Sequence, residues 1–158
     1  MSIAPVKCNI DVKVQAARAF ELFTQHMGQW WPRGKTPGGK PHVDLVIEPR
    51  QNGRWFERDA DGTETPWGKV LTWEPPHRLV LGWQLDHRFR FDSALMMEVE
   101  IRFTDLAAGG TRVSLEHRDL ERLGADAETF AVKVNSGWPE RMENFAHYAA
   151  ASPTARRA

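Results

Sequence analysis

The sequence has very little cysteine, no surplus of charge and no long apolar run. A single cysteine, Cys8, cannot form an intramolecular disulfide. The 21 basic and 21 acidic residues cancel, which argues against a general nucleic-acid binder, since such proteins need a basic excess. No apolar run approaches the roughly 20 residues of a membrane span, and the N-terminus lacks the apolar core of a signal peptide. We expect a cytoplasmic protein with one domain in residues 1–151 and a flexible tail in residues 152–158.

Signatures of common reaction centres are missing as well. The six histidines are scattered without the paired spacing of a zinc site. The chain has no phosphate loop, no dinucleotide fingerprint and no nucleophile elbow. The sequence therefore predicts no metal and no cofactor, and it indicates no defined reaction.

Tryptophan, in contrast, is abundant, with seven residues against one tyrosine. Its large ring and single N–H donor suit the wall of a half-filled cavity as well as a core. Trp30 and Trp31 open a segment, residues 29–42, that contains three prolines and three glycines and also carries Arg33, Lys35 and Lys40. We predict an irregular loop that forms the rim or lid of a ligand site. The alternative is a flexible surface connection whose two tryptophans plug the edge of the core.

Alternation of apolar and polar residues predicts a run of antiparallel strands. They cover residues 6–14, 43–49, 54–58, 63–73, 78–85, 95–103 and 111–118. In the second of them Val43 should face inward, and in the sixth Glu98 and Glu100 should face outward as solvated groups. Trp83 should face inward, whereas the inward face of residues 67–73 stays open, because both faces are partly apolar.

Two helical patterns accompany the strands. A short one covers residues 15–26 and should end at Gly28. A long one covers residues 125–151, and its apolar residues recur at steps of three or four. Pro139 leaves open whether it forms one kinked helix or two. The predicted fold is α+β: a curved antiparallel sheet of about six to seven strands wrapped round the long C-terminal helix.

Three stretches carry a resemblance to a known family. They are residues 68–83 (GKVLTWEPPHRLVLGW), residues 111–117 (TRVSLEH) and residues 136–139 (SGWP) with Phe145 and Tyr148. Together they resemble the AHSA-like (activator of heat-shock-protein ATPase homologue-like) branch of the START-like, or SRPBCC, superfamily, over about residues 3–150. The resemblance implies the helix-grip fold and a cavity between sheet and helix. It implies no single activity, because relatives include lipid carriers, hormone receptors, cyclases and cochaperones.

Three functions follow as hypotheses. The first is binding of a small hydrophobic or amphipathic molecule in that cavity, with Arg33 or Lys35 meeting its polar end and residues 87–91 forming an exposed loop at the mouth. The second is a cyclase- or hydrolase-like enzyme that uses His117 as acid or base, although His117 also suits a structural hydrogen bond. The third is a cochaperone-like module that stimulates a heat-shock ATPase. We expect a monomer or a homodimer.

The predicted cavity residues come from the inward strand faces, the long helix and the Trp-containing loop. They are Trp30, Trp31, Leu81, Trp83, Met97, Val99, His117, Phe130, Val134 and Trp138.

Overall fold

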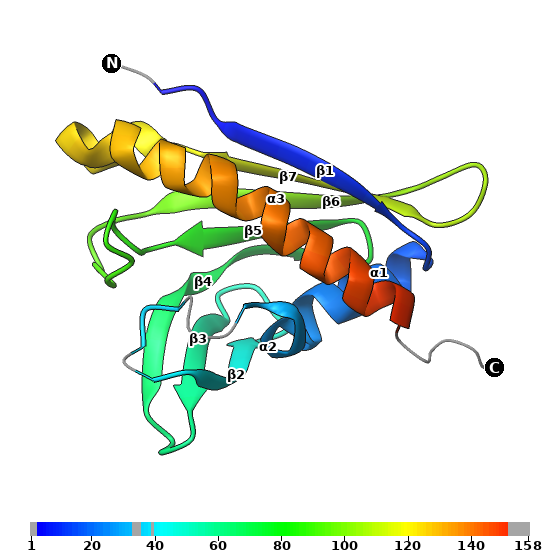
Figure 1. Ribbon diagram of the computed structural model, residues 1–158, viewed down its shortest axis with the longest axis horizontal. Coiled ribbons are helices and arrows are strands. Elements are labelled where there is room, and N and C mark those ends of the chain that lie inside the picture. The colour runs from blue at the N-terminus through cyan, green and yellow to red at the C-terminus, as the bar shows by residue number, and fades with distance from the viewer. Residues whose placement is uncertain (1–2, 33–35, 39, 152–158) are drawn as a thin grey trace.

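The computed structural model of the chain describes residues 3–32, 36–38 and 40–151. Its strands are β1 (Val6–Val12), β2 (His42–Ile47), β3 (Arg54–Asp59), β4 (Glu64–Glu74), β5 (Arg78–Trp83), β6 (Met97–Asp105) and β7 (Thr111–Arg118). Its helices are α1 (Ala16–Gln25), α2 (Met27–Trp30), the 3-10 segment η1 (Leu120–Asp126) and α3 (Ala127–Ala151). Figure 1 shows α3 lying across the concave side of one curved sheet. The predicted helix-grip fold is confirmed.

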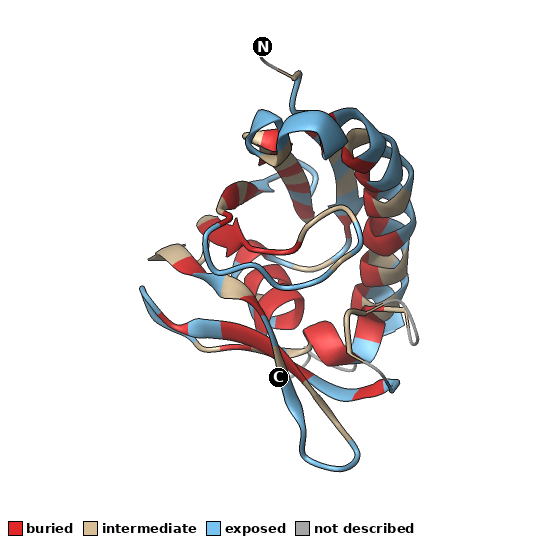
Figure 2. Cartoon of the chain, turned by 90° about the vertical axis from the view of Figure 1, so that its left-hand side faces the viewer, coloured by how far each residue is buried: buried red, intermediate tan, exposed pale blue. Residues whose placement is uncertain are grey.

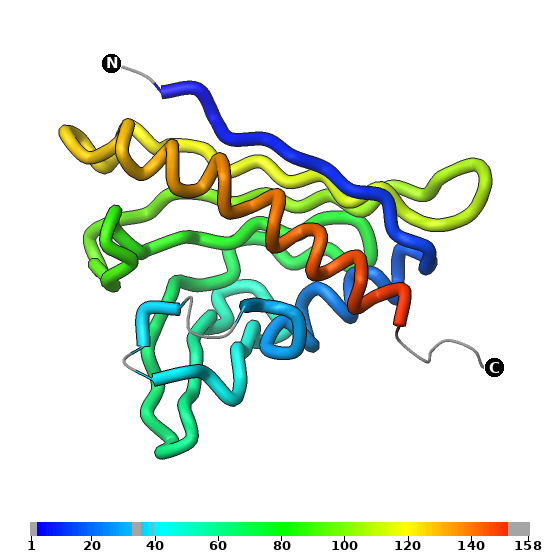
Figure 3. The backbone as a smooth tube through the Cα atoms, in the orientation of Figure 1, coloured from blue at the N-terminus to red at the C-terminus, as the bar shows by residue number. Residues whose placement is uncertain are grey.

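The sheet has seven antiparallel strands in the order β1-β7-β6-β5-β4-β3-β2. β1 and β2 are consecutive in the sequence, yet they lie at opposite edges. The chain crosses from one edge to the other through α1 and α2, as the backbone trace in Figure 3 shows. The remaining strands are joined to their sequence neighbours, so one continuous meander links β2 to β7.

The core lies between the sheet and the helices, where Figure 2 shows most of the buried residues. Side chains alternate between the two faces of a strand, and the inward positions of β5 and β7 follow this rule. Leu79, Leu81 and Trp83 are buried on β5, as are Val113 and His117 on β7. The prediction that Trp83 faces inward agrees with this burial.

Two bulges decide which face of β4 points inward. The ladder with β3 skips Trp67, and the ladder with β5 skips Leu71. Each skipped residue interrupts the alternation. As a result Trp67 and Val70 are buried and Trp73 packs on the core, whereas Lys69 is exposed. Strict alternation cannot bring positions 67, 70 and 73 to one face.

Two expectations near β2 are wrong. α1 ends at Gln25, and Gly28 lies inside α2 rather than ending a helix. A Cβ on Gly28 would lie 2.8 Å from the backbone nitrogen of Leu45, so this glycine permits α2 to approach β2 closely. A register shift between His42 and Asp44 leaves Val43 exposed and buries His42 in its place.

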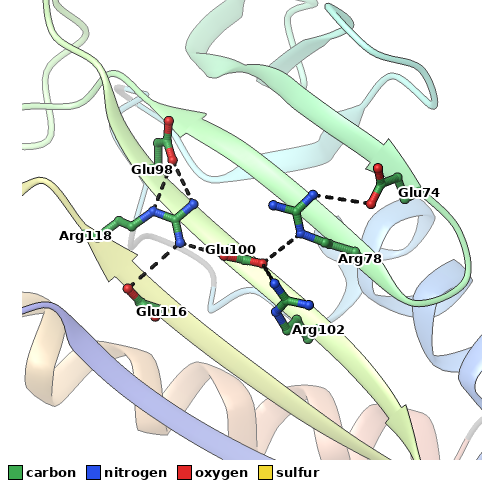
Figure 4. Close-up of polar contacts among 7 residues, drawn as sticks. All are labelled: Glu74, Arg78, Glu98, Glu100, Arg102, Glu116 and Arg118. Atoms are coloured by element: carbon green, nitrogen blue, oxygen red, sulfur yellow. Dashed lines mark hydrogen bonds and ion pairs between the residues drawn. The ribbon is translucent and has the colours of Figure 1, made fainter.

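The expectation that Glu100 is a solvated group is also wrong. It lies on the outer face of the sheet, but its side chain is only 10% exposed and is surrounded by Arg78, Arg102 and Arg118 at 2.8, 2.7 and 2.6 Å (Figure 4). Arg118 also binds Glu98. Burial raises the pKa of Glu100, but hydrogen bonds from Arg118 and Arg78 outweigh burial and lower the pKa to about 2.

α3 runs as one helix from Ala127 to Ala151 with Pro139 inside it, which answers the question that the sequence left open. Within the described residues, no helix is both long and apolar enough to cross a membrane. The predicted tail, residues 152–158, lies outside the described part of the chain.

Candidate functional site

Aromatic side chains fill one end of the space between α3 and the sheet. Phe23 of α1 lies 5.3 Å from Phe145 and 5.8 Å from Phe103, measured between ring centroids. Phe20 lies 5.1 Å from Phe103 and 4.9 Å from Trp73. These four contacts fill the end near the C-terminus of α3 and leave room for a cavity farther along, beside the middle of that helix.

A cavity of about 490 Å³ lies there, within the usual size range of small-molecule sites. Its wall comes from α3, from β4 and β5, from the connection after β5, and from the segment that follows α2. The lining residues are Trp31, Pro37, Trp67, Trp83, Leu85, Phe89, Lys133, Val134, Ser136, Gly137, Trp138, Glu140 and Arg141.

Five tryptophans at this cavity form a closed circuit of ring contacts, which we call the tryptophan ring. In order they are Trp31, Trp67, Trp55, Trp83 and Trp138, and successive ring centroids lie 5.0, 5.3, 5.8, 5.9 and 5.7 Å apart. All contacts are tilted or edge-to-face, the arrangement that aromatic quadrupoles favour. Trp55 stands behind the wall, and the other four line the cavity.

Hydrogen bonds to the rest of the protein fix three of these indoles. The Nε1–H of Trp67 donates to Oε1 of Glu57 at 2.9 Å. That of Trp83 donates to the carbonyl oxygen of Leu85 at 3.0 Å, and that of Trp138 to Nδ1 of His117 at 3.0 Å. Because their polar atoms are already bound, these rings offer mainly carbon surface to a ligand.

His117 lies behind the cavity wall rather than on it. Its Nδ1 accepts the Trp138 hydrogen bond, so the ring proton of the neutral imidazole sits on Nε2. Nε2 is buried and has no hydrogen-bond partner within the part of the chain that the structure describes. Burial lowers the pKa of His117 to about 3. In this arrangement His117 is a neutral acceptor that orients Trp138.

The structure divides the predicted cavity residues into two groups. Trp31, Trp83, Val134 and Trp138 line the cavity. The others are buried in the core beneath it: Trp30, Leu81, Met97, Val99, His117 and Phe130. Arg33 and Lys35, expected to meet the polar end of a ligand, lie outside the described residues, whereas Lys40 is described and pairs with Asp61.

Sequence reasoning missed several wall residues, among them Trp67, Phe89 and Arg141. Phe89 belongs to the loop expected at the mouth, which the structure places on the wall. Arg141 follows Val134 by seven residues and Trp138 by three, the spacing of one helix face. This spacing was the available signal for Arg141, but a search for apolar residues passes over an arginine.

Glu57 ties the segment after α2 to the cavity wall. Its carboxylate is buried and accepts hydrogen bonds from Oγ1 of Thr36 at 2.9 Å, from the backbone N–H of Gly38 at 3.0 Å, and from Trp67. Pro37, between the first two donors, lines the cavity. One carboxylate therefore holds both a wall residue and part of the rim.

We expect Glu57→Ala to destabilise the protein by about 2–3 kcal/mol, since it leaves a buried indole N–H without an acceptor. Glu57→Gln should cost far less, because its amide oxygen can still accept from Trp67 and the hydroxyl of Thr36 can turn to accept from its NH₂. Urea unfolding measures both, and hydrogen exchange at the Gly38 amide reports the rim. Equal stability losses in the two variants would contradict this role for the carboxylate.

No three His, Cys, Asp or Glu side chains gather as a metal site among the described residues.

The profile of the family described as Activator of Hsp90 ATPase homolog 1-like protein matches residues 13–150. The comparison with curated proteins gave no match.

Solved structures resemble the chain over most of its length. An anthrahydroquino-gamma-pyrone synthase, Txn09, in complex with SUM, is 35% identical with a TM-score of 0.66, and the match covers 92% of this chain and 97% of that one. The self-sacrificing resistance protein CalC from Micromonospora echinospora is 28% identical with a TM-score of 0.70, covering 92% and 94%. The Aha1 dimer from Colwellia psychrerythraea is 12% identical with a TM-score of 0.68, covering 96% and 99%, and at this identity it shows the shared fold alone.

Proposed function

The chain belongs to the Activator of Hsp90 ATPase homolog 1-like family, and from this premise we propose that it binds a flat, mainly apolar aromatic molecule in the tryptophan-lined cavity. The observation that carries the proposal is the wall itself. Four indoles line it, and three of them have their N–H groups bound to the protein, so they offer carbon faces for stacking. The 35% identical synthase, whose name describes a fused aromatic compound, supports the same ligand class.

The alternative of a cyclase- or hydrolase-like enzyme draws support from that same relative. His117 is a weak candidate for its acid or base, since its Nδ1 is bound to Trp138. Its lowered pKa of about 3 also makes the imidazole a poor proton acceptor and leaves almost no imidazolium to act as an acid near pH 7. A reaction in this cavity would have to use other groups on the wall. The cochaperone-like role and a homodimer remain predictions.

Ligand binding should quench the intrinsic tryptophan fluorescence in a saturable way. A three-ring aromatic that buries about 250 Å² of apolar surface gains roughly 6 kcal/mol, so we expect a dissociation constant of about 30 µM or weaker for anthraquinone. Val134→Phe, which extends a wall residue into the cavity, should weaken binding at least about tenfold.

Val132→Phe is the matched control, because Val132 is 72% exposed on the same helix. It should leave the affinity unchanged. Linear, unsaturable quenching by anthraquinone, or equal affinities of the two variants, would refute binding in this cavity.

A further inference from the structure

Arg141 is a charged residue on the cavity face of α3. Only 9% of its surface is exposed, and it contributes to the cavity wall beside Trp138 and Trp31. Arginine is rarely buried without partners, because removing a charge from water is costly unless hydrogen bonds or an opposite charge compensate for it. The partners of Arg141 therefore indicate what the cavity is suited to bind.

The described part of the chain satisfies one edge of the Arg141 guanidinium. Nη1 donates to the carbonyl oxygen of Gly137 at 3.1 Å and lies 3.6 Å from Oε1 of Glu140. Cζ lies 4.8 Å from the centre of a Trp31 ring, a cation–π contact that holds the group in place. Nε and Nη2 have no hydrogen-bond partner among the described residues. Burial lowers the pKa of Arg141, although an arginine stays protonated.

The other polar groups of the wall are largely bound within the protein. The hydroxyl of Ser136 donates to backbone carbonyls of its own helix at 3.2 and 3.4 Å. The ammonium of Lys133 donates to the carbonyl oxygen of His87 and lies 5.6 Å from the centre of the Phe89 ring. Arg141 is thus a fixed, nine-tenths buried cation that presents two vacant donors beside stacking surfaces.

We propose that the cavity selects aromatic carboxylates. The carboxylate of such a ligand accepts hydrogen bonds from Nε and Nη2 of Arg141, while its aromatic rings stack on the indoles that line the cavity. This inference rests on the proposed function and names the ligand class of the same site. The planar guanidinium fork matches a carboxylate in two parallel hydrogen bonds. Glu140 lies nearest to Nη1, so it leaves the Nε and Nη2 edge vacant.

Calorimetric titration with anthraquinone-2-carboxylate and with its uncharged amide separates the two proposals. The wild-type protein should bind the acid at least about tenfold more tightly than the amide, the effect of hydrogen bonds to a charged group. Arg141→Met keeps an apolar stem against Trp31 and should reduce the preference to less than about twofold, while affinity for the amide is retained. Retained amide binding also shows that this variant is folded.

Lys133→Met is the matched control, because it removes the same charge from the same cavity wall and should keep most of the preference for the acid. If the wild-type protein binds acid and amide equally, the proposed function stands and the role of Arg141 is refuted. If Lys133→Met abolishes the preference as fully as Arg141→Met does, the preference reflects net charge and this role is likewise refuted. Binding of neither compound would refute the proposed function itself.

Discussion

Lowering the pH from about 6.5 to 4.5 should remove roughly 2 kcal/mol of the free energy of unfolding through His117 alone. The folded state lowers the pKa of this imidazole from 6.5 to about 3 by burial. Below pH 6.5 the unfolded chain therefore binds a proton that the folded chain does not bind. The contribution of His117 to the free energy of unfolding is complete well above pH 6.5. Below that pH it falls, with a slope that approaches about 1.4 kcal/mol for each pH unit.

His117→Asn tests this effect in urea unfolding curves taken from pH 7.5 to 3. Asparagine places an acceptor where Nδ1 stands, so Trp138 keeps a partner while the titrating group is lost. The variant should be less stable at pH 7.5, since it leaves a cavity, but its stability should change much less between pH 6.5 and 4.5. A slope as steep as that of the wild type would show that His117 is not the group responsible.

Glu100 acts in a more acidic window, which overlaps that of His117 below pH 4.5. Its pKa in the folded state is about 2, below the ordinary value of 4.5, so its contribution is complete above pH 4.5 and is lost as the pH falls from 4.5 toward 2. Both proteins should therefore lose stability together below pH 4.5. The difference between their curves above that pH belongs to His117.

Gly68→Ala should prevent folding or reduce the free energy of unfolding by about 4 kcal/mol or more. Gly68 pairs with Trp55 on one side and with Trp83 on the other. A Cβ there would lie 1.7 Å from the carbonyl oxygen of Gly82. Because the obstructing atom belongs to the backbone of the neighbouring strand, no change of rotamer relieves the clash, and β4 and β5 must separate. Thermal unfolding followed by circular dichroism measures the loss.

Gly137→Ala is the control for this substitution. Its Cβ would lie 3.1 Å from Nη1 of Arg141, a side-chain atom that can move. Alanine in place of glycine within a helix gains up to about 1 kcal/mol, so this variant should be as stable as the wild type or slightly more stable. An unchanged midpoint for Gly68→Ala would mean that the two strands have room that their backbone positions do not suggest.

Periodicity predicted the fold well because strands and helices bury one face each. It predicted Trp83 and the β5 face correctly, but it could not place Val70 on the same face as Trp67 and Trp73, since bulges depend on pairing with neighbouring strands. Glu100 was misjudged for a related reason. Its arginine partners come from three strands, and only the register brings them together.

The candidate site was less predictable than the fold. An inward strand face shows that a residue is buried, but not whether it meets another side chain or a cavity. Met97, Val99 and Phe130 are all buried in the core, whereas the cavity opens beside Val134 and Trp138. Arg141 lay on the same helix face, but it was passed over because it is charged.

The tryptophan ring also allows energy transfer between its indoles after one of them absorbs light. Excitation migrates readily between indoles whose centroids lie within 6 Å, so light absorbed by any of the five rings is shared among all of them. The emission should be strongly depolarised before any ligand is added. One bound ligand that accepts the excitation energy should then quench the emission of all five indoles together. The fluorescence will therefore report whether the cavity is occupied rather than which indole the ligand touches.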